Sequence, residues 1–265
     1  ETRIEYQADG TYLQIADTAT KIMTLAGADS MRVLQSFYSA SYSRAKISLV
    51  QILKPTGETI NLDLPSCTQE MADASQMDSN IYDPNHRIIK VAVANLTPGD
   101  VLRAVYVDEI RKPRVPNSFS ELFSLEDTQP ILHERIIVSA PSELPLQSIA
   151  IKNPQGKGPA FQEREENGRH IYQWEVHDVP QVFPEPAMPQ LYYNAQRVIV
   201  STFRSWEEVS RWYDNLCEPR LALDDDLRNG VELLTQEAST DQERIIALYN
   251  FVSQRVRYMG LTLED

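Results

Sequence analysis

The sequence has few cysteines and no long hydrophobic run, and each shortage excludes something. Cys67 and Cys217 are the only cysteines and lie far apart. A zinc site needs more ligands at closer spacing, so we predict no metal site. We expect two unpaired thiols, although a disulfide would be possible in an oxidising compartment. No run of 18 apolar residues occurs, so no transmembrane helix is expected.

Basic residues are also outnumbered, because 25 Lys and Arg face 38 Asp and Glu for a net charge of -13. Nucleic acid and anionic membranes would repel such a chain, so we expect no nucleic-acid partner. Hydrophobic residues make up 42% and charged residues 24%, which is typical of a globular protein. The length of 265 residues allows one large domain or two ordinary ones.

The chain starts at Glu1 without a basic and apolar leader. We therefore expect a processed mature protein or an excised piece of a longer one.

Alternating apolar and polar residues dominate residues 1–203. Asp9-Gly10 and Asn167-Gly168 are strong hairpin signals between such segments. Residues 47–53 are apolar on both faces, which predicts a central strand covered on both sides. Residues 66–85 are polar, which predicts a long loop with one helical turn. The pattern as a whole predicts a large antiparallel β-sandwich over residues 1–203.

Residues 204–265 change to a helical period. Ser205 and Thr240 each precede a glutamate at the third following position, which predicts two capping boxes. Asp224 to Asp226 suit another helix N-terminus. We therefore predict a mainly β protein followed by about three helices that pack together, with the division after residue 203. Ile245, Tyr249, Val252 and Val256 form one apolar stripe.

No motif in the sequence identifies a catalytic centre. The P-loop, the dinucleotide fingerprint, the zincin motif and the nucleophile elbow are absent. His133 and His170 fall in predicted strands, where outward polar positions or core hydrogen bonds are the default interpretation. Cys217 lies near a helix C-terminus, which does not activate a thiol. We predict no cofactor and no catalytic residue in this chain.

Two weak candidates for binding remain. Residues 111–116 hold the one basic cluster of an acidic chain, and a solvated loop is its simplest interpretation. A site for an acidic ligand is the alternative. A carbohydrate platform would instead need a row of exposed aromatic side chains, although Trp174 fits the core better. The candidate binding residues are Arg111, Lys112, Arg114, Tyr192 and Tyr193.

Six segments follow one another in a recognisable order: residues 52–60, 96–102, 172–175, 184–189, 201–206 and 246–260. Their order resembles one bacterial family, in which a β-rich domain of unknown function precedes a transglutaminase-like domain. The resemblance covers nearly the whole chain, and the order of the segments is more specific than any one of them.

The resemblance implies that the helices after Ser205 open a papain-like core with a Cys-His-Asp triad. The nucleophile would follow the Arg257-Tyr258-Met259-Gly260 segment by a few tens of residues, so no catalytic residue of the family can be assigned to this chain. Family members are usually exported, which implies an extracytoplasmic location. The expected partner is a protein or peptide substrate of the parent enzyme.

Three functions therefore stay open at this point. The first is a non-catalytic module of a transglutaminase-like protease or acyltransferase, which positions substrate or a partner. The second is a stand-alone sandwich that binds carbohydrate or protein. The third is a complete hydrolase with a carboxylate pair brought together by the fold, since Glu165-Glu166 are merely adjacent in a turn.

Overall fold

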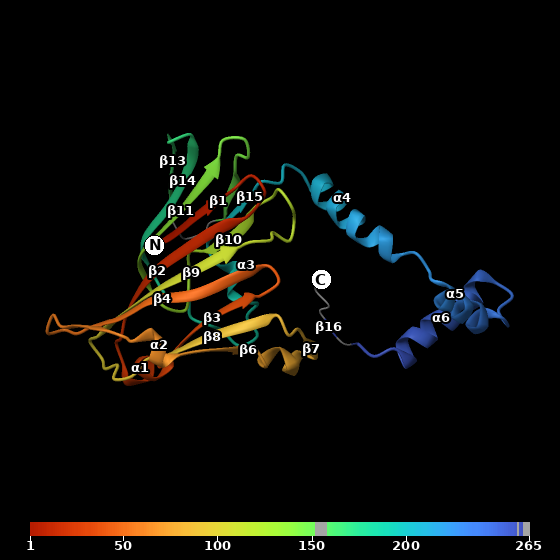
Figure 1. Cartoon of the computed structure of the whole chain (residues 1–265), viewed down its shortest axis with the longest axis horizontal. Helices are drawn as coiled ribbons and strands as arrows, with labels where there is room; N and C mark the ends of the chain where they lie inside the picture. The colour runs from red at the N-terminus through yellow and green to blue at the C-terminus, as the bar shows by residue number, and fades with distance from the viewer. Residues whose placement is uncertain (152–157, 259, 262–265) are drawn as a thin grey trace. The chain divides into compact units, whose positions relative to one another are not determined.

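Strands dominate the chain before Arg204 and helices dominate it afterwards, as the sequence predicts (Figure 1). The computed structural model describes residues 1–151, 158–258 and 260–261. The sequence Asn153-Pro154-Gln155-Gly156 predicts a turn that lies outside the described residues. The chain forms two compact units. Among the described residues, one comprises residues 1–73 and 84–204, and the other comprises residues 74–83 and 205–261.

An eight-stranded sheet is the largest element of the first unit, and its strands lie side by side in Figure 1. Asn167 and Gly168 both have positive φ in its β13–β14 hairpin, as an Asn-Gly turn requires. In spatial order the strands are β13 (Ala160–Glu166), β14 (Arg169–Val179), β11 (Ile131–Pro141), β1 (Thr2–Tyr6), β2 (Tyr12–Lys21), β9 (Val101–Ile110), β4 (Ser43–Leu53) and β5 (Thr59–Asn61).

The large sheet is mixed, because β1 and β11 run parallel while every other neighbouring pair in it is antiparallel. This pair differs from the antiparallel arrangement predicted for the whole sandwich. A parallel pair normally needs a crossover helix. Here the chain between β1 and β11 runs through other strands of the fold, so no such helix is required.

Two small sheets cover one face of the large sheet. Ile4 on β1 lies opposite Gln14 on β2, so these two residues share one face of the sheet. Thr18 lies on the same face of β2, opposite Ala104 on β9. Ile4 and Ala104 belong to two different buried clusters, so both clusters lie on this face. The covering sheets are β10 (Ser120–Ser124), β15 (Arg197–Ser201) and β12 (Gln147–Ile151), and β3 (Val33–Ser39), β8 (His86–Ala92) and β6 (Thr68–Ala72).

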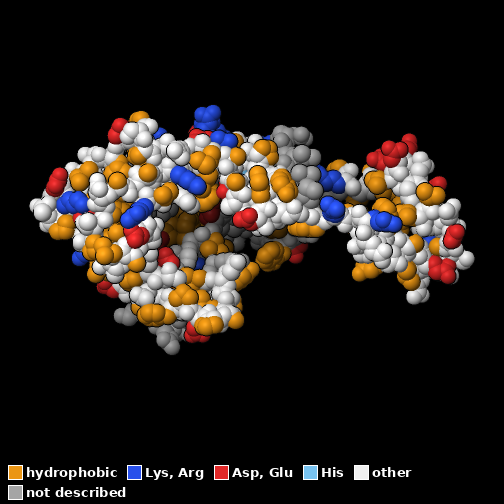
Figure 2. All heavy atoms as spheres, turned by 90° about the horizontal axis from the view of Figure 1, so that it is seen from below, with side chains coloured by type: hydrophobic (Ala, Val, Ile, Leu, Met, Phe, Trp, Pro, Cys, Tyr) orange, Lys and Arg blue, Asp and Glu red, His pale blue; other side chains and the backbone are white. Residues whose placement is uncertain are grey.

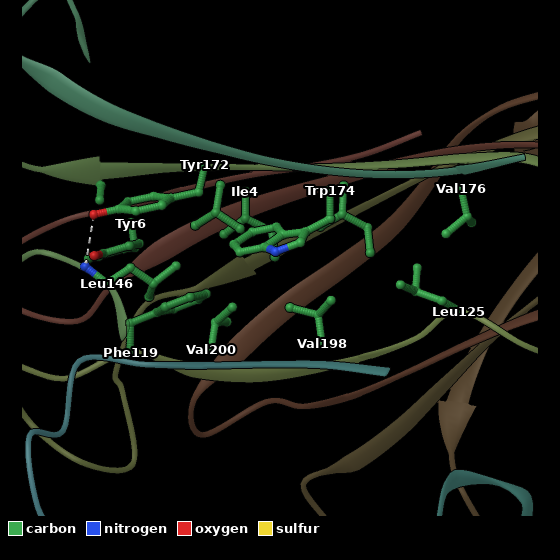
Figure 3. Packing of buried hydrophobic residues seen from close by; sticks show 13 residues of the cluster. Ile4, Tyr6, Phe119, Leu125, Leu146, Tyr172, Trp174, Val176, Val198 and Val200 are labelled. Atoms are coloured by element: carbon green, nitrogen blue, oxygen red, sulfur yellow. Dashed lines mark hydrogen bonds between the residues drawn. The ribbon is translucent and has the colours of Figure 1, made fainter. Parts of the chain in front are cut away.

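The first cluster fills the space between β14 and β15. Trp174 is 2% exposed, which confirms the predicted core position. In Figure 3 its indole lies on the side of Val198 of the opposing sheet, whereas the ring of Tyr172 points toward Leu146. Tyr172 accepts a hydrogen bond from the amide of Leu146 at 3.3 Å. Aromatic stacking and burial together make this cluster the main packing centre of β14.

The second cluster joins β4 and β9 to β8. Strict alternation along β4 would put Ile47 on the face opposite to Val50 and Ile52, but all three are buried in this cluster. The register of β4 against β9 shifts between Ile47 and Leu49. A β-bulge there adds one residue and returns Ile47 to the core face. The expectation of a strand covered on both faces was therefore wrong.

The polar segment 66–85 contains more structure than the loop predicted for it. It includes β6, the helical turn η1 (Ser75–Ser79) and β7 (Ile81–Tyr82). All five side chains of β6 are exposed, so the strand lacks the hydrophobic alternation that would have indicated it. Its backbone pairs with β8 at the sheet edge.

Two segments that carry the family resemblance meet at a buried ion pair. Lys54 follows β4, and its Nζ lies 2.8 Å from Oδ2 of Asp100. The same oxygen accepts hydrogen bonds from the backbone and hydroxyl of Thr97 at 2.8 and 3.1 Å. Because the Asp100 carboxylate binds both Lys54 and the turn at Thr97, we assign these residues a structural role.

Three long helices follow the strands, as predicted, and their N-caps are the expected ones. Ser205 and Asp224 accept hydrogen bonds from the third following amide, and Thr240 forms a full capping box with Glu243. The described part holds no helix that could span a membrane. The helices are α1 (Leu25–Ser30), α2 (Leu64–Cys67), α3 (Leu191–Asn194), α4 (Trp206–Cys217), the turn η2 (Glu218–Arg220), α5 (Asp225–Thr235) and α6 (Asp241–Arg255).

None of the residues in α4, α5 and α6 is buried. α5 and α6 pack against each other, whereas α4 makes no comparable contact with either among the described residues. The expectation that all three pack together was therefore wrong. Figure 2 shows hydrophobic side chains on the surface, interspersed with acidic ones. The second unit also contains a short parallel pair between β7 and β16 (Gly260–Leu261).

Candidate functional site

An open depression lies where β1, β2 and β9 meet, beside the predicted basic cluster. It has a volume of ≈ 460 Å³. Gly10 makes the β1–β2 turn with φ +87, and a Cβ there would lie 2.5 Å from the carbonyl of Ser118. The turn and the loop before β10 therefore fit only with glycine. The lining residues are Glu5, Gln7, Thr11, Tyr12, Leu13, Glu109, Ile110 and Arg111.

Tyr12 is one of the lining residues, but its side chain packs against the core cluster. Its hydroxyl donates to Oε1 of Glu121 at 2.6 Å, and its ring meets Phe119 edge-on at 5.2 Å. Burial and the neighbouring carboxylate raise the pKa of the Tyr12 hydroxyl well above its ordinary value. The hydroxyl therefore stays neutral and supports the fold.

The basic cluster beside the depression is held within the chain. Arg111 donates to Oε2 of Glu109 from both Nε and an Nη, at 3.0 and 2.7 Å. Lys112 Nζ and Arg114 Cζ lie 5.6 and 4.3 Å from the ring centroid of Tyr42. The amides of Arg111 and Lys112 also donate to the Tyr42 carbonyl.

Each of the three predicted cations therefore has a partner inside the first unit. Cation–π contacts of this kind stabilise an exposed loop by about 0.5–1 kcal/mol. The bidentate Arg111 pair lowers the pKa of Glu109 and keeps it ionised. An acidic ligand would have to displace these partners, which favours the structural interpretation of the loop.

The aromatic candidates do not form a row. Trp174 is buried in the core, and Tyr193 on α3 is 60% exposed. The backbone of Tyr192 also lies in α3, but its side chain lies outside the described residues. Among the described aromatic candidates, Tyr193 alone is exposed, so they provide no carbohydrate platform.

A second open depression of ≈ 420 Å³ brings carboxylates together near β10 and β11. Burial raises the pKa of Glu134 there, and nearby Asp127 acts in the same direction. Glu126 is buried and accepts a hydrogen bond from the amide of Gln196 at 2.8 Å. Glu126 therefore has a structural role, which leaves a weak basis for a catalytic pair.

Both cysteines are free thiols in ordinary surroundings. Cys67 ends α2 and lies 3.3 Å from the carbonyl oxygen of Asp63, to which it donates. Cys217 is the last residue of α4. Cys217 also interacts with Tyr213 and raises the pKa of that hydroxyl. These partners do not activate a nucleophile.

One group of described side chains has the composition of a metal site: His133, Glu175 and His177. Sequence reasoning treated these residues separately. Glu175 and His177 are two positions apart on β14 and share a face, which the sequence could have indicated. His133 joins them only through the register of β11 against β14.

The chain shares its fold with a crystal structure described as a "putative protease" from Parabacteroides distasonis. The TM-score is 0.77 and the sequence identity is 16%, over 95% of this chain and 48% of that one. The chain therefore spans about half the length of that structure. No curated protein matches the sequence.

A family model matches residues 8–183, from the β1–β2 turn to the segment after β14. Its description is Domain of Unknown Function with solved-structure structure (DUF3857). The match covers well over half of the chain. This chain therefore belongs to the DUF3857 family.

Proposed function

We propose that this chain is the N-terminal part of an exported enzyme with a transglutaminase-like cysteine core. The first unit is then a non-catalytic module that positions a protein or peptide substrate, or a partner in the cell envelope. Helices α4 to α6 open the catalytic domain. The nucleophile, its histidine and its carboxylate come from sequence beyond these helices.

The exposed apolar surface of α4 to α6 is the observation that carries this proposal. On α6 the predicted stripe is open, with Ile245 66% and Tyr249 70% exposed. Covering each such side chain stabilises a protein by roughly 1.5–3 kcal/mol. Helices with well-formed caps and no buried residue are expected where further protein packs on them. Other exposed apolar residues of these helices are Trp206, Tyr213, Leu227, Leu233, Ile246 and Val252.

The comparisons support the same proposal at a coarser level. The DUF3857 match covers much of the β-rich part, and the structural likeness extends over the helices as well. The similar structure is about twice as long as this chain and is described as a "putative protease". A further domain, like the remaining half of that structure, would pack on the exposed apolar stripe of α6.

The test compares the 265-residue chain with the full product of its gene. Both are assayed for peptide hydrolysis and for amine incorporation into a glutamine substrate, with and without iodoacetamide. We expect turnover only in the full product, with loss after alkylation. Replacing the first cysteine after Gly260 by serine should abolish it, whereas Cys67→Ser and Cys217→Ser should not.

Two outcomes would contradict the proposal. One is a full gene product that has no thiol-dependent activity and no cysteine after Gly260. The other is iodoacetamide-sensitive turnover by the 265-residue chain that is lost in Cys67→Ser or Cys217→Ser. The alternative of a stand-alone binding module is weaker, because Trp174 is buried and the described aromatic candidates form no exposed row.

A further inference from the structure

Two histidines and one glutamate meet on the face of the large sheet opposite to its two cores. His133 on β11 lies directly opposite His177 on β14, and Glu175 precedes His177 by two residues. Side chains two positions apart on a strand share a face. All three therefore project from neighbouring positions of one antiparallel pair, where backbone pairing fixes their spacing.

The three side chains aim ligand atoms at one region. Nε2 of His133 lies 2.7 Å from Oε1 of Glu175, and Nε2 of His177 lies 3.4 Å from the same oxygen. The two imidazoles stack with centroids 4.5 Å apart and planes 3° from parallel. One ligand atom from each residue lies within 4.8 Å of the other two.

Neighbouring residues hold the glutamate in this orientation. Gln173 donates from Nε2 to Oε2 of Glu175 at 3.2 Å, which leaves Oε1 facing the histidines. Arg135 lies opposite Glu175, and its charge is offset by an ion pair with Glu1. Hydrogen bonds that orient a ligand carboxylate are a recurring part of metal sites.

An ordinary ion pair explains only part of this arrangement. A single protonated histidine would neutralise Glu175, and a second charged imidazole stacked on the first would be repelled by it. Two neutral imidazoles and one carboxylate instead supply three donor atoms close together. Each imidazole lone pair lies in its ring plane and the two rings are stacked, so one ring turns out of the stack when both bind the same cation.

We propose that His133, Glu175 and His177 bind one divalent transition-metal ion, with Zn²⁺ as the best match. Two histidines and one glutamate are an established donor set for zinc, with Zn–N distances of about 2.0–2.1 Å and tetrahedral ligands about 3.3 Å apart. The two separations from the histidines to Glu175, 2.7 and 3.4 Å, lie on either side of that value, and all three ligand atoms lie within 4.8 Å of one another. Ca²⁺ and Mg²⁺ prefer oxygen ligands throughout and suit this set poorly.

The bound ion would join β11 to β14 on the exposed face of the sheet. His133 and His177 are 47% and 61% exposed, so remaining coordination positions face water. The ion therefore cross-links two strands that backbone pairing already holds. This site lies in the first unit and does not depend on the proposed function of the whole protein.

The test is calorimetric titration of the untagged chain with ZnCl₂ in a buffer that does not bind metal. Because Cys67 and Cys217 are free and could bind zinc, both are replaced by serine throughout. We expect one ion per chain. His133→Ala and His177→Ala should each weaken binding at least about tenfold, and Glu175→Gln should also weaken it.

His170→Ala is the matched control. His170 lies on the same strand, on its other face, with Glu163 at 3.8 Å and Glu165 at 3.5 Å, but without a second imidazole. Its replacement should leave zinc affinity unchanged. Zinc should raise the melting temperature of the parent but not of the His133→Ala/His177→Ala double variant, and EDTA should reverse that rise.

The proposal is overturned by either of two results. One is the absence of saturable binding to the parent chain at millimolar zinc. The other is binding that the His133 and His177 variants leave intact. Both histidines are well exposed, so these variants are expected to keep the fold, and circular dichroism checks this.

Discussion

The two units of this chain bury their apolar residues to very different extents. In the first unit, a mixed sheet and two small sheets enclose two clusters of fully buried side chains. In the second, three helices have well-formed caps but no buried residue. The first unit therefore has a core of its own, whereas the helices have the local signals for helix formation without one.

This difference separates local from long-range sources of stability. A capping residue needs only the backbone amides of its own helix, so Thr240 caps α6 whatever packs on it. A helix face contributes stability only when another element covers it. A partner segment that packs on α6 would bury its exposed apolar stripe and so stabilise the helix.

The largest expected effect comes from the core of the first unit. Trp174→Ala should destabilise the chain by about 3–5 kcal/mol, because it removes a buried indole from between two sheets. Trp206→Ala is the matched control, since this tryptophan on α4 is 82% exposed. Thermal unfolding by circular dichroism measures both. Equal effects of the two substitutions would abolish the contrast between the units.

A smaller effect is expected at the buried ion pair. Asp100→Asn should cost about 1.5–3 kcal/mol, because it weakens charged hydrogen bonds to Lys54 and Thr97. The control is Asp29→Asn, at an exposed aspartate paired with Arg32, which should change stability by less than about 1 kcal/mol. Urea unfolding at neutral pH distinguishes the two.

The same carboxylate predicts a pH dependence with a definite sign. The hydrogen bond from Lys54 lowers the pKa of Asp100 in the folded state. Its contribution to stability is therefore complete above the unfolded carboxyl value of about 3.9 and is lost as pH falls through the folded pKa. The gap in stability between the parent chain and Asp100→Asn should narrow below pH 4, and a constant gap would contradict this.

Loss of a helix cap should act locally. Thr240→Ala should destabilise α6 by about 1 kcal/mol, because the third amide of the helix loses its acceptor. We expect faster amide exchange in α6 and no change in the unfolding temperature of the first unit. Thr56→Ala, in the β4–β5 turn, is the control substitution outside any helix. A lower unfolding temperature of the first unit in Thr240→Ala would show that the two units unfold together.

The smallest effect is expected from the half-buried Glu134. Burial raises its pKa, so ionisation costs stability above the unfolded value of about 4.3. Glu134→Gln should stabilise the chain at pH 7 by less than about 1 kcal/mol and should have little effect below pH 4. Glu58→Gln, at an exposed turn, is the control, and melting temperatures at the two pH values give the comparison.

The elements that sequence predicted well are those with local causes. The Asn167-Gly168 hairpin and the caps at Ser205 and Thr240 depend on a few adjacent residues. Those that it missed depend on distant partners. β6 is an exposed edge strand defined by β8, and the bulge near Ile47 is visible only in the register against β9.

The candidate sites show the same division. The basic cluster was visible in the sequence, but its partners Tyr42 and Glu109 come from another turn and from the adjoining strand. His133 and His177 are 44 positions apart in numbering and meet because β11 pairs with β14. Trp174 was placed correctly, because alternation within one strand was sufficient.

Amide exchange within the 265-residue chain tests the central claim most directly. Peptides from β14, which carries Trp174, are compared with peptides from α6 under native conditions. We predict strong protection in β14 and exchange in α6 that is faster by orders of magnitude, because no residue of α6 is buried. Protection of α6 equal to that of β14 would contradict the account.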